Sequence, residues 1–491
     1  MKLSHFLRSY VASALLAFQP IAGLNIDKCD GILVSDTLPV LINSTSLYGH
    51  LKKLQNIADT HHGNRITGST GHNQTIQYIQ RHLKSQGYYV EVQPFHDLMQ
   101  VDGKATLWAN GEAFEAEPIG WSPESTFTDR PLIAVDGIGC KAADYPQETI
   151  GAIVLVGSGG CSLSEKSIAA GEAGAIGLLI YELTQLTPSL GGMNDRHIPS
   201  ARIAYRDAQR IMNHRRPLSA DIFDVYMQYK EVYSYNIFAT WECGDEDKVL
   251  MVGTHTDSVS TSAGMNDNAS GIASLLEIAT ELARFKTNST VKFAFWTASE
   301  PCLLGSKHWM STVHTEELQK IRLYLDATML GSPNGAFKVY DSHASSLGIP
   351  GPHGSKEAEE TLTEGFKAQG LNFTMTEISN RSDYATFFNA KIPFAGLFSG
   401  ANGFKTSKEV TMFGGNADVP YDANYHEPGD NLQNINMTIL FQNTKALAHA
   451  VGVYGRSLDN FPASAIRHYG APMKHLYLMA ALIWVAHYLL S

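Results

Sequence analysis

The stretch Val249–Glu300 constrains the fold of this chain most, because it places polar side chains directly after two apolar runs. The run VLMVG leads to His255 and Asp257, and a loop rich in glycine and asparagine then carries Asp267. A second apolar run, VKFAFW, leads to Glu300. Between the runs, apolar residues recur at helical spacing, at Ile272, Leu275, Leu276, Ala279, Leu282 and Phe285. The pattern predicts strand, loop, helix, strand and loop, with the polar groups at the carboxyl ends of the strands, where open α/β sheets bind ligands.

These polar groups suit a metal ion. One imidazole and two carboxylates are ligands that zinc takes readily. A single His-x-Asp pair is usually an ordinary surface hydrogen bond, but further candidates follow other segments. Asp326 ends the apolar run LYLD, and the segment YDANYHEPGD supplies Tyr425 and His426. The convergence of several segments on one sheet edge favours a metal site.

Six motifs give the chain a specific resemblance: THTDS, MNDNASG, ASEPCLLGS, YLDATMLGSPN, RSDYATFF and YDANYHEPGD. Together they resemble the co-catalytic di-zinc aminopeptidases, in particular the secreted leucine aminopeptidase and aminopeptidase Y group. The likeness extends from about Ser44 to about Leu458. It implies an α/β fold with a mixed, mostly parallel sheet flanked by helices, as in zinc exopeptidases, and an inserted β-rich protease-associated domain.

The resemblance implies two zinc ions that share one carboxylate. It assigns the first zinc to His255, Asp267 and Asp326. It assigns the second zinc to Asp267, Glu300 and His426, so that Asp267 bridges the two ions.

Three further residues acquire roles from the same resemblance. Asp257 matches the carboxylate that orients the metal-binding histidine, a role that second partners of zinc ligands commonly have. Tyr425 matches the tyrosine that stabilises the tetrahedral intermediate. Arg381, in the RSD loop, matches an arginine that lies near the bound substrate.

Ser299 departs from the family pattern. Similar enzymes have Glu-Glu where this chain has Ser299-Glu300, and the intact spacing from Trp296 to Gly305 argues against a shift of register. The first glutamate of the pair is the general base of the reaction. A serine hydroxyl cannot hold a proton near neutral pH, and general base catalysis supplies about 10²–10⁴-fold in rate. We therefore expect strongly reduced peptidase activity. Glu427 is a poor substitute base, because adjacent side chains diverge.

Three functions remain open from the sequence. The first is an exopeptidase that releases N-terminal residues, with a preference for leucine-like ones. The second is a zinc-binding pseudo-peptidase that captures peptides or has a structural role. The third is a related zinc-dependent acyl transfer or carboxypeptidase activity. Release of leucine, zinc content and cutting at the C-terminus would separate them.

Composition narrows the class of protein and its partners. The 491 residues carry a net charge of −11, which argues against nucleic acid as a partner. A hydrophobic content of 44% indicates a globular chain. We expect a monomer that acts on peptides.

Both ends of the chain carry targeting patterns. Residues 1–23 have basic residues before a short apolar stretch and predict a signal peptide, hence secretion. Residues 461–491 combine small residues, a polar spacer and an apolar tail. That arrangement is typical of a lipid-anchor (GPI) signal, although a packed tail helix and a short membrane anchor are alternatives. Membrane association is expected only through such an anchor. Seven N-x-S/T sites agree with a secreted glycoprotein: Asn43, Asn73, Asn268, Asn288, Asn372, Asn380 and Asn436.

The chain is expected to divide into two peptidase segments around an insert. Residues 24–114 and 223–460 form the peptidase domain, and residues 115–222, with short strands and Gly-rich turns, resemble the protease-associated domain. Of five cysteines, Cys140 and Cys161 are the expected disulfide, while the other three are unassigned. The alternating segment Asp224–Cys243 predicts antiparallel edge strands. Arg65 and the two histidines before it read as ordinary surface or interdomain residues.

Overall fold

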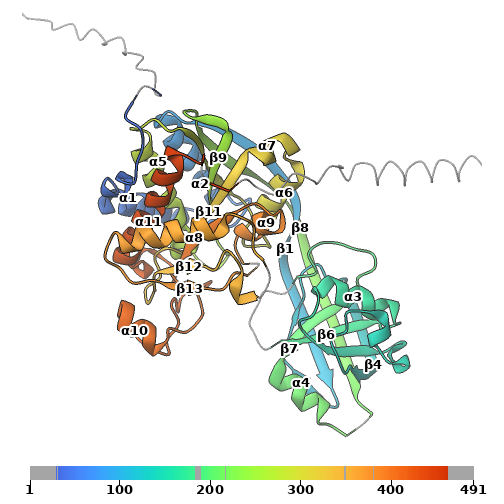
Figure 1. Ribbon diagram of the computed structural model, residues 1–491. Helices are drawn as coiled ribbons and strands as arrows, with labels where there is room; N and C mark the ends of the chain where they lie inside the picture. The colour runs from blue at the N-terminus through green and yellow to red at the C-terminus, as the bar shows by residue number, and fades with distance from the viewer. Residues whose placement is uncertain are drawn as a thin grey trace, which may run out of the picture.

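A computed structural model describes residues 29, 31–182, 189–215, 217–347, 350–379, 381–459 and 461–462. The expected signal peptide and residues 463–491, which include the whole apolar tail, lie outside these ranges. The described chain forms a large lobe of sheet and helices and a smaller lobe, joined by two long strands (Figure 1). Among the described residues, no helix has the length and apolar character needed to cross a membrane.

The central sheet is mixed, as predicted. Its strands follow the order β13-β12-β14-β11-β9-β10-β8. β10, β9, β11 and β14 run parallel to their neighbours, whereas β8 and β12 pair antiparallel with β10 and β14. The bounds of these strands are β8 Ser219–Trp241, β9 Asp245–His255, β10 Ser289–Trp296, β11 Ile321–Ala327, β12 Lys338–Tyr340, β13 Thr374–Thr376 and β14 Phe394–Phe398.

Helices cover both faces of this sheet, which explains why its inner strands are apolar throughout rather than alternating. Leu250 and Val252 of β9 face one hydrophobic cluster, with α1, α2, α5, α8 and α11. Val249 and Met251 face a second cluster, with α6, α7 and α9. The helices are α1 Ser44–Asp59, α2 Thr70–Ser85, α5 Ser270–Leu282, α6 Leu304–Thr312, α7 Thr315–Lys320, α8 Ser355–Lys367, α9 Tyr384–Asn389, α10 Ser407–Phe413 and α11 Met437–Arg456.

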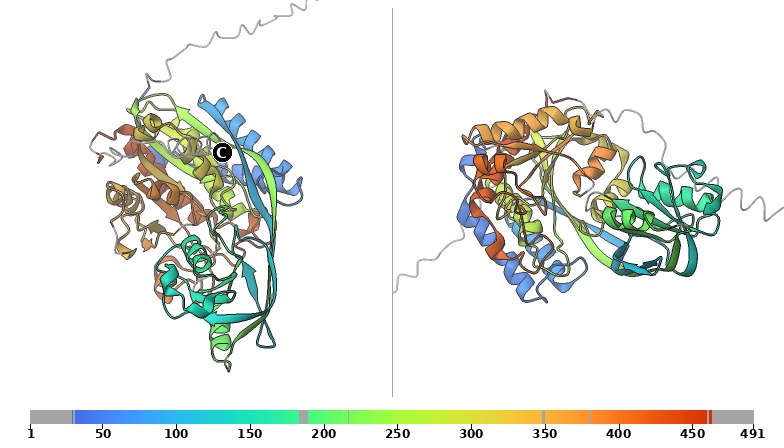
Figure 2. Two further views of the ribbon diagram at one scale, coloured as in Figure 1. Left: turned by 90° about the vertical axis from the view of Figure 1, so that its right-hand side faces the viewer. Right: turned by 90° about the horizontal axis from the view of Figure 1, so that it is seen from below.

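The smaller lobe is the insert. It contains β2 Glu112–Phe114, β3 Ala116–Pro118, β4 Ser125–Ala134, β5 Ile153–Gly157, α3 Leu163–Glu172, β6 Gly177–Glu182, β7 Ser200–Ala204 and α4 Tyr205–Met212. β4, β5, β6 and β7 are parallel neighbours and enclose their own apolar clusters. Figure 2 shows this lobe set to one side of the large lobe.

The segment Asp224–Cys243 corrects one prediction. The pairing is antiparallel, as predicted, but the segment is one long strand, β8, which has a second neighbour at each end: β4 up to Val225 and β10 from Ile237. It pairs along its length with β1 (Tyr89–Ala109), and the pair forms the connection between the two lobes. Its alternation is real, but alternation alone does not reveal how many neighbours a strand has.

Two disulfides form. Cys140–Cys161 lies in the insert, as predicted, and Cys29–Cys243 joins the start of the described chain to the residues after β8. Cys302 is free.

Candidate metal centre

The sheet brings the predicted ligands to one edge. β9 ends at His255, which lies opposite Trp296 at the end of the parallel strand β10, and Glu300 follows four residues later. Asp326 on β11 lies opposite Gly253 on the other side of β9. The loop between β9 and α5 contains the irregular helical turn η4 (Met265–Ala269) and carries Asp267.

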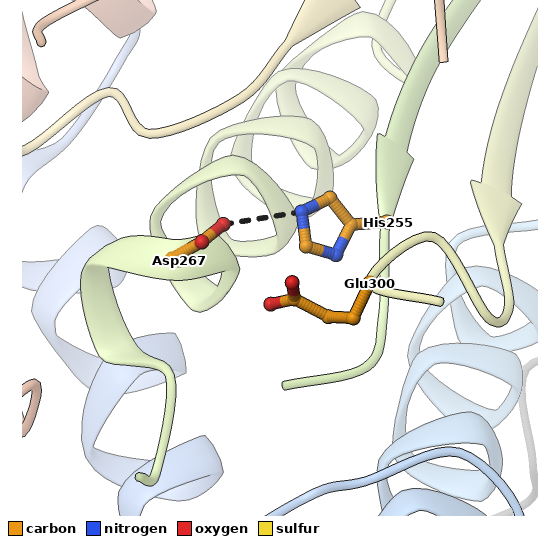
Figure 3. A group of neighbouring side chains, drawn as sticks. All are labelled: His255, Asp267 and Glu300. Carbon is orange, nitrogen blue, oxygen red and sulfur yellow. Dashed lines mark ion pairs between the residues drawn. The ribbon is translucent and has the colours of Figure 1, made fainter. Parts of the chain in front are cut away.

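Four of the five predicted ligands converge. His255 Nε2 lies 3.2 Å from Asp267 Oδ1, and His426 Nε2 lies 3.3 Å from Asp267 Oδ2 and 3.2 Å from Glu300 Oε2. The ligand atoms of His255, Asp267 and Glu300 all lie within 4.8 Å of one another. Figure 3 shows these three side chains pointing into a common space, from the end of β9, from the η4 turn and from the loop after β10.

The donor set fits a metal ion. Glu300 Oε1 and His426 Nε2 are buried and have no partner with hydrogen-bond geometry among the described residues. Buried polar atoms without partners are costly, so their concentration here indicates a ligand. Imidazole and carboxylate are the ligands expected for zinc, and Asp267 faces both histidines, as a bridging carboxylate would.

The charges of the site are strongly coupled. Burial opposes protonation of His426, but the nearby Asp267 and Glu300 raise its pKa to about 10. Burial and the neighbouring Asp267 raise the pKa of Glu300. A cation at this position would replace the protons that otherwise hold the carboxylates and imidazoles together.

Asp257 connects His255 with the loop after β10. Its Oδ1 lies 3.5 Å from His255 Nδ1, on the side of the ring away from Asp267. The same carboxylate accepts the backbone N–H groups of Ser299 and Glu300, each at 3.1 Å. One buried side chain thus contacts both a histidine and the loop after β10.

Asp326 lies outside the converging group. Its carboxylate accepts hydroxyl hydrogen bonds from Ser382 at 2.7 Å, Thr328 at 3.0 Å and Tyr324 at 3.2 Å. Burial and the neighbouring Asp383 raise the pKa of Asp326 to about 7. Its role as a ligand of the first zinc therefore rests on its position on β11 and on the resemblance.

The loop of His426 is held by hydrogen bonds. Asn424 donates from Nδ2 to Asn434 Oδ1 at 2.7 Å. Asn434 in turn donates to Asp422 and Asp430. Asp430 accepts the backbone N–H groups of Asn266 and Asp267, which connects this loop to the η4 turn.

Tyr425 and Arg381 lie beside the cluster. The Tyr425 ring stacks on His426, with ring centroids 3.9 Å apart. The Arg381 guanidinium lies 5.3 Å from the centre of the Tyr425 ring. Burial, Asp267 and Glu300 raise the pKa of Tyr425, so its hydroxyl remains a hydrogen-bond donor.

Arg65 is misassigned by the sequence prediction. It is fully buried rather than a surface or interdomain residue, and its guanidinium donates to the backbone carbonyls of Thr256, Ala263 and Gly264. These carbonyls belong to the loop between His255 and Asp267. An arginine that follows a helix gave no sign of this contact, since its partners lie about 200 positions further along the chain.

Asp383 is a residue of the site that sequence reasoning missed. Its carboxylate lies 2.7 Å from the hydroxyl of Ser299 and is 1% exposed. The RSD motif that contains it predicts a role only for Arg381. Glu427, in contrast, is exposed and directed to solvent.

Comparison with known proteins identifies the family. The chain belongs to peptidase family M28, which residues 236–451 match, and residues 128–211 match the PA domain. Among its relatives, leucine aminopeptidase 2 of Trichophyton tonsurans is 38% identical over 88% of each chain, and that of Trichophyton rubrum is 37% identical over 88% of each chain.

Solved structures share the fold. An aminopeptidase from Aneurinibacillus sp. strain AM-1 has a TM-score of 0.69 at 23% identity and covers 88% of this chain and 99% of its own. A zinc aminopeptidase from Bacillus subtilis has a TM-score of 0.58 at 22% identity and covers 86% of this chain and 97% of its own. The predicted fold, with its inserted domain, is thereby confirmed.

Proposed function

We propose that this protein is a zinc-dependent aminopeptidase that releases N-terminal, leucine-like residues from peptides, at a rate reduced by Ser299. The observation that carries the proposal is the convergence of His255, Asp267, Glu300 and His426 at the carboxyl edge of the sheet. Membership of peptidase family M28 and the names of the fungal relatives support this activity.

The proposed centre would hold two zinc ions through these four residues and Asp326. Bound zinc polarises a carbonyl oxygen and makes water more acidic. Asp257 orients His255 toward the metal. Arg381 holds the peptide beside Tyr425, whose hydroxyl donates to the oxygen that becomes negative during attack.

Ser299 limits the rate in this proposal. It occupies the position of the glutamate that accepts a proton from the attacking water in similar enzymes. Losing a direct general base costs about 10²–10⁴-fold, or roughly 3–5 kcal/mol of activation free energy. The alternative that this replacement favours is a zinc-binding pseudo-peptidase that captures peptides without cleaving them.

The remaining expectations are proposals of the same kind. Secretion through a signal peptide at residues 1–23, a lipid anchor near residues 461–491 and a monomeric state would place the enzyme outside the cell. The two disulfides agree with an oxidising compartment.

A paired assay tests the proposal. Purified wild type and Ser299→Glu are compared for release of leucine from an amino-acid anilide, with zinc measured in the same samples. We expect Ser299→Glu to be faster by about 10²-fold or more. Full zinc content with no hydrolysis in either protein would favour the pseudo-peptidase, and cleavage at the C-terminus of peptides would favour a carboxypeptidase.

A further inference from the structure

The hydroxyl of Ser299 is bonded to a second carboxylate rather than to solvent. Ser299 Oγ donates to Asp383 Oδ2 at 2.7 Å, although the two residues are 84 positions apart. Ser299 is itself fixed, because its backbone N–H donates to Asp257 at 3.1 Å. The side chain that replaces the glutamate therefore has a defined orientation and a defined partner.

Asp383 has the properties of a proton acceptor. It is 1% exposed, and its Oδ1 has no hydrogen-bond partner among the described residues. The nearby hydroxyl of Ser306 lies 3.0 Å from Thr386 Oγ1 and also acts on the Asp383 carboxylate as a hydrogen-bond donor. A buried carboxylate with an unpartnered oxygen is costly unless it has a function. Burial raises the pKa of Asp383, which brings it closer to neutral pH, where a general base works best.

We propose that Ser299 and Asp383 together replace the missing glutamate, with Ser299 as a relay and Asp383 as the base. This inference rests on the proposed peptidase function and deepens it. As the water attacks the scissile carbonyl, one water proton passes to Ser299 Oγ while the Ser299 hydroxyl proton passes to Asp383 Oδ2. The serine hydroxyl is regenerated and Asp383 becomes neutral. When the C–N bond breaks, the proton returns from Asp383 through Ser299 to the departing amine nitrogen.

The relay assigns the residual activity to a specific pair of side chains. Transfer of the water proton through the Ser299 hydroxyl to Asp383 takes two coupled proton movements. It is therefore slower than direct transfer to a glutamate. The relay therefore coexists with a slow wild type and a faster Ser299→Glu variant. Exposed Glu427 takes no part.

The test compares Asp383→Asn in two backgrounds. In the natural Ser299 background, Asp383→Asn and Ser299→Ala should each lower kcat by about tenfold or more, and the double variant should lose no more than either. In the Ser299→Glu background, where the glutamate accepts the proton directly, Asp383→Asn should change kcat by less than about threefold. Glu427→Gln, the matched change from acid to amide, should leave wild-type activity unchanged.

Two measurements without substrate accompany the kinetics. Zinc content and zinc affinity should be the same in wild type and Asp383→Asn. Infrared difference spectra of the zinc-free protein should show a carboxyl band that is absent in Asp383→Asn and shifted in Ser299→Ala. If Asp383→Asn fails to fold, Ser299→Ala alone tests the relay, through its loss of kcat together with its infrared shift.

Several results would overturn the relay. These are an equal loss from Asp383→Asn in both backgrounds, a loss of zinc in that variant, or a Ser299→Ala variant that keeps the wild-type rate. Failure of the proposed function looks different. In that case Ser299→Glu binds zinc but releases no leucine, and the relay falls with the activity it serves.

Discussion

Arg65 shows at the scale of one residue how the metal loop is held. Its three carbonyl partners lie on the loop between His255 and Asp267, and the nearest charges to it are carboxylates of the site. Burial lowers the pKa of Arg65 to about 10, so it stays charged at neutral pH. Arg65 is therefore a positioning residue: it keeps two ligands at the right separation and partly neutralises the carboxylates.

We predict that Arg65→Met lowers zinc affinity by about tenfold or more, because it leaves three backbone carbonyls without their donor. The zinc affinity of Arg65→Lys should lie between those of Arg65→Met and wild type, since one ammonium group cannot donate to all three carbonyls. Calorimetric titration of zinc into metal-free protein measures this. Arg284→Met, on an exposed part of the chain after α5, is the matched control and should bind zinc as wild type does. Unchanged affinity in Arg65→Met would refute the role.

At the scale of elements, α5 and α1 are joined by a buried carboxylate. Glu277 on α5 is 1% exposed and accepts the backbone N–H of Asn43, the N-cap of α1, at 2.7 Å. Burial raises the pKa of Glu277 from 4.5 to about 7. A carboxyl group whose pKa is raised by folding stabilises the folded state below its unfolded pKa, and that contribution is lost as the pH rises through the folded pKa.

Glu277→Gln should therefore become increasingly more stable than wild type as the pH rises from about 4.5 to about 7, and the difference should then level off. We expect a plateau of roughly 1–3 kcal/mol, up to the full conversion of the pKa shift at about 1.4 kcal/mol per unit. Thermal unfolding of the zinc-loaded proteins over a pH series measures it. Glu360→Gln, at an exposed position on α8, should show no such trend. A difference that is constant with pH would contradict the account.

The elements around the site could be predicted from the sequence, and some of the contacts between them could not. β9, α5 and β10 followed from apolar runs and helical spacing, since local periodicity determines both. The ligands at the strand ends followed because parallel strands deliver their carboxyl ends to one edge. The burial of Arg65, the approach of Asp383 to Ser299 and the two neighbours of β8 depend on contacts between distant segments. No local pattern encodes those contacts.

At the scale of the whole molecule, the two disulfides constrain the chain over very different distances. Cys29–Cys243 closes a separation of 214 residues, and Cys140–Cys161 closes one of 21 within the insert. A longer closed loop removes more entropy from the unfolded chain.

We predict that Cys29→Ser with Cys243→Ser destabilises the large lobe by about 2–4 kcal/mol, seen as a lower melting temperature. Cys140→Ser with Cys161→Ser should destabilise the insert and leave the melting of the large lobe nearly unchanged. Scanning calorimetry shows two separate transitions, one for the large lobe and one for the insert, if the lobes unfold separately. Equal shifts of a single transition in both variants would show that the lobes unfold as one unit.

The central claim is that scattered side chains form one zinc centre, and metal analysis of dialysed protein tests it most directly. We predict about two zinc ions per chain in wild type, and loss of both in Asp267→Ala, because this carboxylate faces both histidines. Wild-type protein without zinc after equilibration in zinc, or an Asp267→Ala variant that keeps its full zinc content, would contradict the account.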